Sequence, residues 1–111
     1  MAKAKLSEAQ FQSQVVRLAH LRGWKVAHFR RVRVQRRNGS VYYETPVAAD
    51  GAGFPDLILS RGDRLVAAEL KVGRNQPTAE QSAWGWALIR GGVMWHVWRP
   101  ELWTDIEETL T

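Results

Sequence analysis

Two acidic residues and a lysine, Asp56, Glu69 and Lys71, have a spacing that can bring them together across a β-hairpin. The dipeptide Gly62-Asp63 lies between two apolar runs, and glycine at the first central position suits a two-residue type II′ turn. Counted back from such a turn, Asp56 stands directly opposite Glu69 on one side of the sheet. Lys71, two residues beyond Glu69, projects from that same side. The spacing therefore predicts two carboxylates and an ammonium group at the open end of one hairpin.

A cluster of this kind favours metal-assisted hydrolysis. Facing carboxylates repel each other, so holding them together costs stability unless a cation lies between them. Carboxylate oxygens are hard ligands and the chain has no cysteine, so we expect Mg²⁺, with Mn²⁺ as a substitute. The backbone carbonyl of Leu70 is a further candidate ligand. A metal held there would stabilise charge on a phosphate, and Lys71 would hold the attacking water or a phosphate oxygen. The set suffices to hydrolyse a phosphodiester bond.

The same residues also allow a purely structural interpretation. Asp56 would close the turn at Pro55, and Glu69 and Lys71 would belong to a solvated strand face. Against this, Glu69 and Lys71 lie inside the apolar run of residues 65–72, where charged side chains are costly without a role.

Three sequence blocks resemble the VRR-NUC branch of the PD-(D/E)xK nucleases. In chain order they are Gly53-Phe54-Pro55-Asp56-Leu57, Ala68-Glu69-Leu70-Lys71 and Pro77-Thr78-Ala79-Glu80-Gln81. The resemblance covers almost the whole chain except the arginine-rich segment of residues 30–44. It implies a single α/β domain over residues 1–111 with a restriction-endonuclease-like core, in which helices flank a mixed central sheet. It also implies Mg²⁺-dependent cleavage of duplex or branched DNA, resembling a junction resolvase, by a compact homodimer of phage or prophage type.

The resemblance further implies individual roles. The residues matching Asp56 and Glu69 bind the metal, the one matching Lys71 assists the water, the one matching Glu8 completes the site, and the one matching Gln81 lies at its edge. Helical spacing independently places Glu8 within the core-facing stripe of the first helix, although the helix dipole also favours an acid in a first turn. Gln81 could instead act only as the capping-box partner of its own helix.

Helix and strand signals alternate along the chain and place these residues on regular elements. Capping-box patterns open helices after Ser7 and Thr78, and the Asn38-Gly39 dipeptide predicts a further hairpin. The expected elements are a helix over 8–22, a strand over 24–29, an arginine-rich hairpin over 30–44, a loop over 46–55, a hairpin over 56–72, a loop over 73–77, a helix over 79–90, a strand over 93–99 and a helix over 101–110.

The charge distribution favours a polyanionic partner. Sixteen Lys and Arg residues against eleven Asp and Glu give a net charge of +5, and a basic surface typically attracts nucleic acid. In an extended strand the first hairpin would present a positive row to phosphates, backed by valines. The candidate DNA contacts are Arg31, Arg33 and Arg37, with Arg74 in the loop after Lys71. The alternative is a charged edge strand that discourages aggregation. In that case we expect Arg74, Arg22, Lys3 and Lys5 to bind the DNA instead.

Composition excludes several other classes. Without cysteine there is no disulfide, thiol nucleophile or thiolate zinc site. No apolar run is long enough to span a membrane and the N-terminus lacks a signal-peptide core, so we expect no membrane partner and a cytoplasmic location. The family resemblance implies that the cell is a bacterium or a phage-infected host. Two alternatives remain: a non-catalytic nucleic-acid-binding module that retains the fold, and a structural subunit that dimerises through its tryptophans and acquires activity only with a partner.

Overall fold

The computed structural model describes residues 6–29, 32–44 and 47–111. Its elements follow the predicted order. They are α1 (Glu8–Leu21), β1 (Lys25–His28), β2 (Val32–Gln35), β3 (Val41–Glu44), β4 (Leu57–Arg61), β5 (Arg64–Leu70), α2 (Ala79–Arg90), β6 (Met94–Trp98), a 3-10 turn η1 (Pro100–Leu102) and α3 (Trp103–Thr109). The C-terminal segment was expected to form one helix over 101–110; Pro100 instead begins the 3-10 turn and α3 starts only at Trp103.

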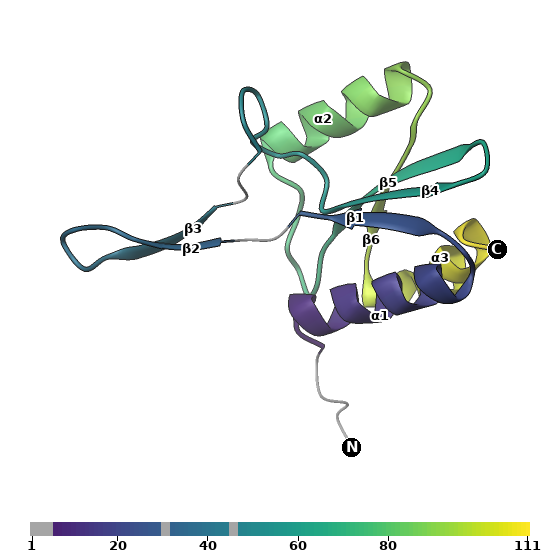
Figure 1. Cartoon of the computed structure of the whole chain (residues 1–111), viewed down its shortest axis with the longest axis horizontal. Helices are drawn as coiled ribbons and strands as arrows, with labels where there is room; N and C mark the ends of the chain where they lie inside the picture. Colours follow the sequence, from purple (N-terminus) through teal and green to yellow (C-terminus); the bar gives the residue numbers. More distant parts are fainter. Residues whose placement is uncertain (1–5, 30–31, 45–46) are drawn as a thin grey trace.

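A four-stranded mixed sheet forms the centre of the molecule. Its strand order is β1-β4-β5-β6; the first three strands are antiparallel neighbours, and β6 runs parallel to β5. Helices α1 and α3 cover one face and α2 covers the other (Figure 1). The predicted α/β class, with helices flanking a mixed sheet, is therefore confirmed. Within the described residues, no helix has both the length and the apolar character needed to cross a membrane.

Helix α1 begins at the predicted capping box and buries the predicted stripe. The Ser7 hydroxyl accepts from the Gln10 N–H at 3.1 Å, and the Gln10 side-chain oxygen accepts from the Ser7 N–H at 2.8 Å. Phe11, Val15 and Ala19 recur at helical spacing and are fully buried. This reciprocal cap fixes where the helix starts, and therefore where Glu8 stands.

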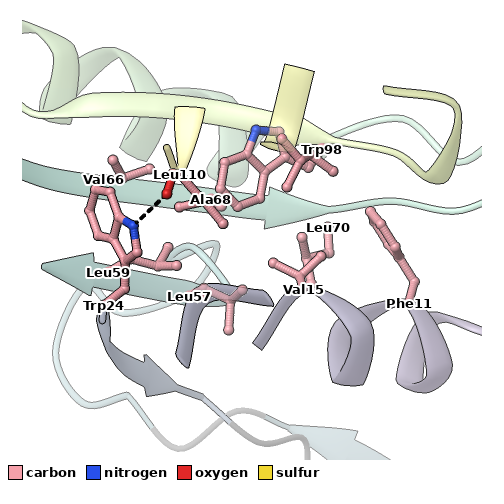
Figure 2. Packing of buried hydrophobic residues seen from close by; sticks show 12 residues of the cluster. Phe11, Val15, Trp24, Leu57, Leu59, Val66, Ala68, Leu70, Trp98 and Leu110 are labelled. Atoms are coloured by element: carbon pink, nitrogen blue, oxygen red, sulfur yellow. Dashed lines mark hydrogen bonds between the residues drawn. The ribbon is translucent and has the colours of Figure 1, made fainter. Parts of the chain in front are cut away.

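The main core lies between α1, α3 and the sheet. Alternate residues of β4 and β5 point into it, because successive strand side chains face opposite sides. Figure 2 shows Leu57 and Leu70 packed near Val15 of α1, and Trp24 donating its indole N–H to the carbonyl of Leu110 at 3.0 Å. The remaining β4 and β5 residues face α2, and Asp56 and Glu69 belong to that side.

Hairpin β4–β5 has the predicted register. Arg61 pairs with Arg64 and Leu57 pairs with Ala68. Of the two turn residues only Gly62 has a positive φ, of 61°, as a type II′ turn requires. The next position outward from the Leu57 pair places Asp56 opposite Glu69.

The arginine-rich hairpin β2–β3 forms a separate two-stranded sheet that projects from the body (Figure 1), and residues 32–44 are called the arm below. Gln35 pairs with Val41, and the Arg36 N–H donates to the Ser40 carbonyl at 2.8 Å. The turn is therefore one residue longer than the Asn38-Gly39 dipeptide alone, with Gly39 at φ 87°. Glycine in this conformation closes a three-residue loop. As a correction to the predicted positive row, Arg37 lies in the turn and not in the strand.

Candidate active site

The open end of hairpin β4–β5 brings Asp56 and Glu69 face to face. The Leu70 backbone N–H donates to Oδ2 of Asp56 at 2.8 Å, which ties the Asp56 side chain across to the opposite strand. The register and this bond together hold the two carboxyl groups at the same edge of the sheet. The predicted pair is thus assembled by the hairpin itself.

Glu69 is the unusual member of the pair. It is 2% exposed and is the one charged side chain that is buried among the described residues. Its Oε1 accepts from Nε2 of Gln81 at 2.8 Å and lies 4.0 Å from Nζ of Lys71. Its Oε2 is buried without a hydrogen-bond partner. The charged form of Glu69 thus leaves this buried oxygen without a donor, whereas its protonated form can share a hydrogen bond with Asp56.

The surroundings of Glu69 disfavour its charged form. Burial is the largest cause, followed by the charge of the neighbouring Asp56 carboxyl and by a side-chain hydrogen bond with it; together they raise the pKa of Glu69 to about 9. The charge of Lys71 acts in the opposite direction, and that of Glu8 adds to the rise. A divalent cation between the two carboxyl groups would reverse this balance, because it favours both deprotonated forms. The donor set fits a hard cation: two facing carboxyl groups, one with an unpartnered buried oxygen.

A cavity of about 480 Å³ opens onto the pair. The start of α1, the start of α2, the end of β5, the loop 47–56 and strand β3 all contribute to its walls. The predicted site residues that line it are Glu8, Asp56, Glu69, Lys71 and Gln81. Residues far apart in the sequence are therefore gathered at one end of the sheet.

Gln81 takes both of the roles that the sequence left open. Its side-chain oxygen accepts from the Thr78 N–H at 2.8 Å, completing the capping box of α2, and its NH₂ group donates to Glu69. An amide has an acceptor at one end and donors at the other, so the two functions do not compete. The cap orients the amide, and the amide in turn orients Glu69.

Glu8 reaches the cavity wall but does not form a ligand cluster with the pair. Within the described ranges, no three His, Asp or Glu side chains are close enough to hold a metal ion. Asp56 and Glu69 are therefore the protein carboxylates best placed for a cation. The ligand roles of Glu8 and of the Leu70 carbonyl stay predictions.

The loop 47–56 is fixed to α2 by contacts that the sequence did not reveal. Gly53 has φ 82°, and a Cβ there would stand 2.5 Å from the backbone of Glu80. The Trp84 indole N–H donates to the Asp50 carbonyl at 2.9 Å, and the Phe54 and Trp84 rings meet edge to face at 5.0 Å. Glycine in the Gly53-Phe54-Pro55-Asp56 block was the available signal, because it marks a close approach of backbone.

The candidate DNA contacts are spread over two segments. Arg33 lies in β2 and Arg37 in the turn of the arm, whereas Arg31 lies outside the described residues. Arg74 is exposed in the loop after Lys71. Arg99, which the sequence did not single out, donates to the carbonyl of Gly73 at 3.1 Å and holds that loop in place.

Comparison with known proteins leaves the site to be interpreted from its own chemistry. No protein-family model, no curated protein and no solved structure matches this chain.

Proposed function

We propose that this protein is a metal-dependent DNA endonuclease with a PD-(D/E)xK core that hydrolyses phosphodiester bonds as a homodimer. The observation that carries the proposal is the buried Glu69 facing Asp56 with one carboxyl oxygen unpartnered. Such an arrangement is unfavourable by itself and becomes favourable with a cation bound. A purely structural pair would keep the proton on Glu69, whereas a metal-binding pair would release it when the cation binds.

Different residues of the proposed site bind the metal and orient its ligands. Asp56 and Glu69 would hold Mg²⁺, or Mn²⁺ in its place, with the Leu70 carbonyl and Glu8 as further ligands. The metal supplies Lewis-acid stabilisation of phosphate charge and lowers the pKa of water. The Leu70 N–H holds Asp56 in place and Gln81 holds Oε1 of Glu69, so Oε2 is left for the metal.

Lys71 provides a positive group at the mouth of the same site. Its Nζ lies 4.0 Å from the Glu69 carboxyl, and its side chain is largely but not fully covered. An ammonium group has three donors, so Lys71 can orient a water or a phosphate oxygen while remaining close to Glu69. We assign it the role of positioning the nucleophile.

The position of the arm supports nucleic acid as the substrate. The arm leaves the body at the end where α1 and α2 begin, which is the end that carries Glu8 and Gln81 (Figure 1). Its tip carries Arg36 and the exposed Arg37. A basic segment beside a carboxylate pair would hold the phosphate backbone without neutralising the metal ligands.

Cleavage assays with Mg²⁺ test the proposal directly. Linear duplex, single-stranded, flap and four-way-junction DNA are incubated with the wild type, with Glu69→Gln and with Asp63→Ala, which changes an exposed acid at the opposite end of the same hairpin. We expect cleavage by the wild type and by Asp63→Ala, inhibition by EDTA, and no cleavage by Glu69→Gln. Sedimentation should give twice the 12.7 kDa of one chain.

A non-catalytic binding module is the second candidate, favoured by the finding that no three His, Asp or Glu side chains within the described residues are close enough to hold a metal ion together. Such a module would bind DNA equally well with and without EDTA and would cut none of the four substrates. That result would overturn the nuclease proposal.

A further inference from the structure

Tyr43 of β3 is an aromatic residue in an unexpected place. Its side chain is 62% exposed, and it nevertheless lines the same cavity as Asp56 and Glu69. It lies on the arm, outside the sequence blocks that suggested the nuclease. A large exposed ring beside a polar cavity calls for a partner, because exposed apolar area in water is unfavourable.

The neighbouring tyrosine of the same strand has a partner within the arm. Tyr42 points to the opposite face of β3, and the guanidinium of Arg36 covers its ring at 4.2 Å from the centroid. Tyr42 is thereby part of the arm's own packing. Tyr43 has the same side chain and lies on the same strand, but it lines the cavity and remains largely exposed.

The cavity offers two kinds of surface that match the two parts of a nucleotide. Asp56, Glu69 and Lys71 form a polar side suited to phosphate chemistry, and Tyr43 adds an aromatic side. The volume of about 480 Å³ lies within the range of roughly 300–1,000 Å³ in which proteins enclose small ligands. Every base has a π-face that can stack on an accessible aromatic ring.

We propose that Tyr43 stacks on a nucleobase next to the phosphodiester bond held at Asp56 and Glu69, and so positions the strand that is cut. The proposal rests on the proposed nuclease function and adds its substrate class. Bases inside a continuous duplex are covered on both faces, so a base can reach Tyr43 only when it is unpaired or displaced. The substrate is therefore nucleic acid with at least one unstacked nucleotide at the cut site.

Fluorescence of 2-aminopurine, which reports stacking of the base, tests this inference. One oligonucleotide carries the probe unpaired within a duplex, and a matched duplex carries it paired. Both are titrated in Ca²⁺ with the wild type, Tyr43→Phe, Tyr43→Ala and Val41→Ala. Val41 is the matched control, because it lies on the same strand and face, is 39% exposed and is not among the residues that line the cavity.

We expect the wild type, Tyr43→Phe and Val41→Ala to quench the unpaired probe on binding, since stacking needs only the ring. Tyr43→Ala should lose the quenching and bind the unpaired substrate about 5- to 150-fold more weakly, as expected for one stacked base. Binding of the fully paired duplex should change much less. The preference for the unpaired substrate is therefore the quantity that a merely structural role would not change.

Several outcomes would overturn the inference. Unaltered quenching in Tyr43→Ala would do so, as would an equal loss of affinity for both substrates, which indicates a disrupted arm. A changed oligomeric state with unchanged DNA binding would assign the ring to a protein interface instead. Cleavage in Mg²⁺ separates the two proposals: no cleavage by the wild type refutes the nuclease, whereas wild-type rate and preference in Tyr43→Ala refute only the stacking.

Discussion

The two ends of hairpin β4–β5 each bring together a pair of like charges. At the closed end Arg61 stands opposite Arg64, and at the open end Asp56 stands opposite Glu69. Directly opposed like charges are unfavourable in a sheet. The two pairs share one hairpin and one register, so the difference between them lies in what surrounds each.

At the closed end the surroundings compensate the charge. Arg61 donates to the carbonyl of Arg22 at 2.9 Å, and Arg64 donates to the carbonyl of Thr111 at 3.1 Å. Both guanidinium groups lie over the Trp24 ring, at 4.8 and 4.9 Å from its centroid. Each arginine remains partly exposed to water. These contacts fasten the C-terminal residues to the sheet.

At the open end a proton on Glu69 removes the repulsion when no cation is bound. Glu69 is buried with an unpartnered oxygen, and the nearest ammonium group, that of Lys71, is 4.0 Å from the other oxygen. The closed-end pair is satisfied by contacts within the fold, whereas both carboxyl groups of the open-end pair can be charged together only with a cation between them, as the proposed metal site requires. The following predictions separate the two ends.

The largest effect is expected on catalysis at the open end. Asp56→Ala and Glu69→Gln each remove a proposed metal ligand worth several kcal/mol of transition-state stabilisation. We expect cleavage to fall by about 10³-fold or more, with the circular dichroism spectrum unchanged. Arg64→Gln at the closed end serves as the control and should keep its activity. Full activity in Asp56→Ala would disprove the assignment.

The second prediction concerns stability without metal. Because the pKa of Glu69 is about 9 in the folded protein against an ordinary value of 4.5, the folded state retains a proton that the unfolded chain releases. In EDTA the free energy of unfolding should therefore fall as pH rises from about 5 to 8, by at most ~1.4 kcal/mol per pH unit.

The same denaturant titrations test the cause of this pH dependence. Glu69→Gln should flatten it, because the amide does not titrate. Mg²⁺ should raise the stability of the wild type and leave that of Glu69→Gln nearly unchanged. A pH dependence that persists in Glu69→Gln would assign it to another group.

The third prediction concerns the closed end. Arg61→Ala removes hydrogen bonds from a charged donor and its packing on Trp24, and should lower the free energy of unfolding by ~1.5–3 kcal/mol. Activity per folded molecule should be kept, because the residue is at the far end of the hairpin. Arg17→Ala, at an exposed position on α1, is the control and should change stability little. If Arg61→Ala and Arg17→Ala lowered the free energy of unfolding equally, the loss in Arg61→Ala could not be assigned to the closed-end interactions.

The smallest effect is expected for the arm. Changing Arg31, Arg33 and Arg37 together to Gln should weaken DNA binding regardless of sequence, and should reduce the log–log salt slope by about 0.9 for each phosphate that the protein no longer neutralises. Arg61→Gln should leave the slope unaltered, because its guanidinium is engaged with backbone carbonyls. A slope that does not change in the triple variant would move the DNA-binding surface to Arg74, Arg22, Lys3 and Lys5.

Local rules accounted for most of the elements and for the central pair. The capping boxes at Ser7 and Thr78 and the type II′ turn at Gly62 involve residues at most a few positions apart, so sequence suffices to predict them. The facing of Asp56 and Glu69 follows from that turn and the two-residue period of a strand. These features can therefore be predicted without knowing how distant parts of the chain pack.

Tertiary structure decided the features that depend on elements distant in sequence. The burial of Glu69, its unpartnered oxygen and the approach of Glu8 require α1, α2 and the sheet to be packed together. The capping role of Gln81 was readable from its helix, but its bond to Glu69 was not. The exposure of Tyr43 to the cavity depends on where the arm leaves the body. Packing between distant elements depends on the whole chain, so a local sequence pattern does not predict it.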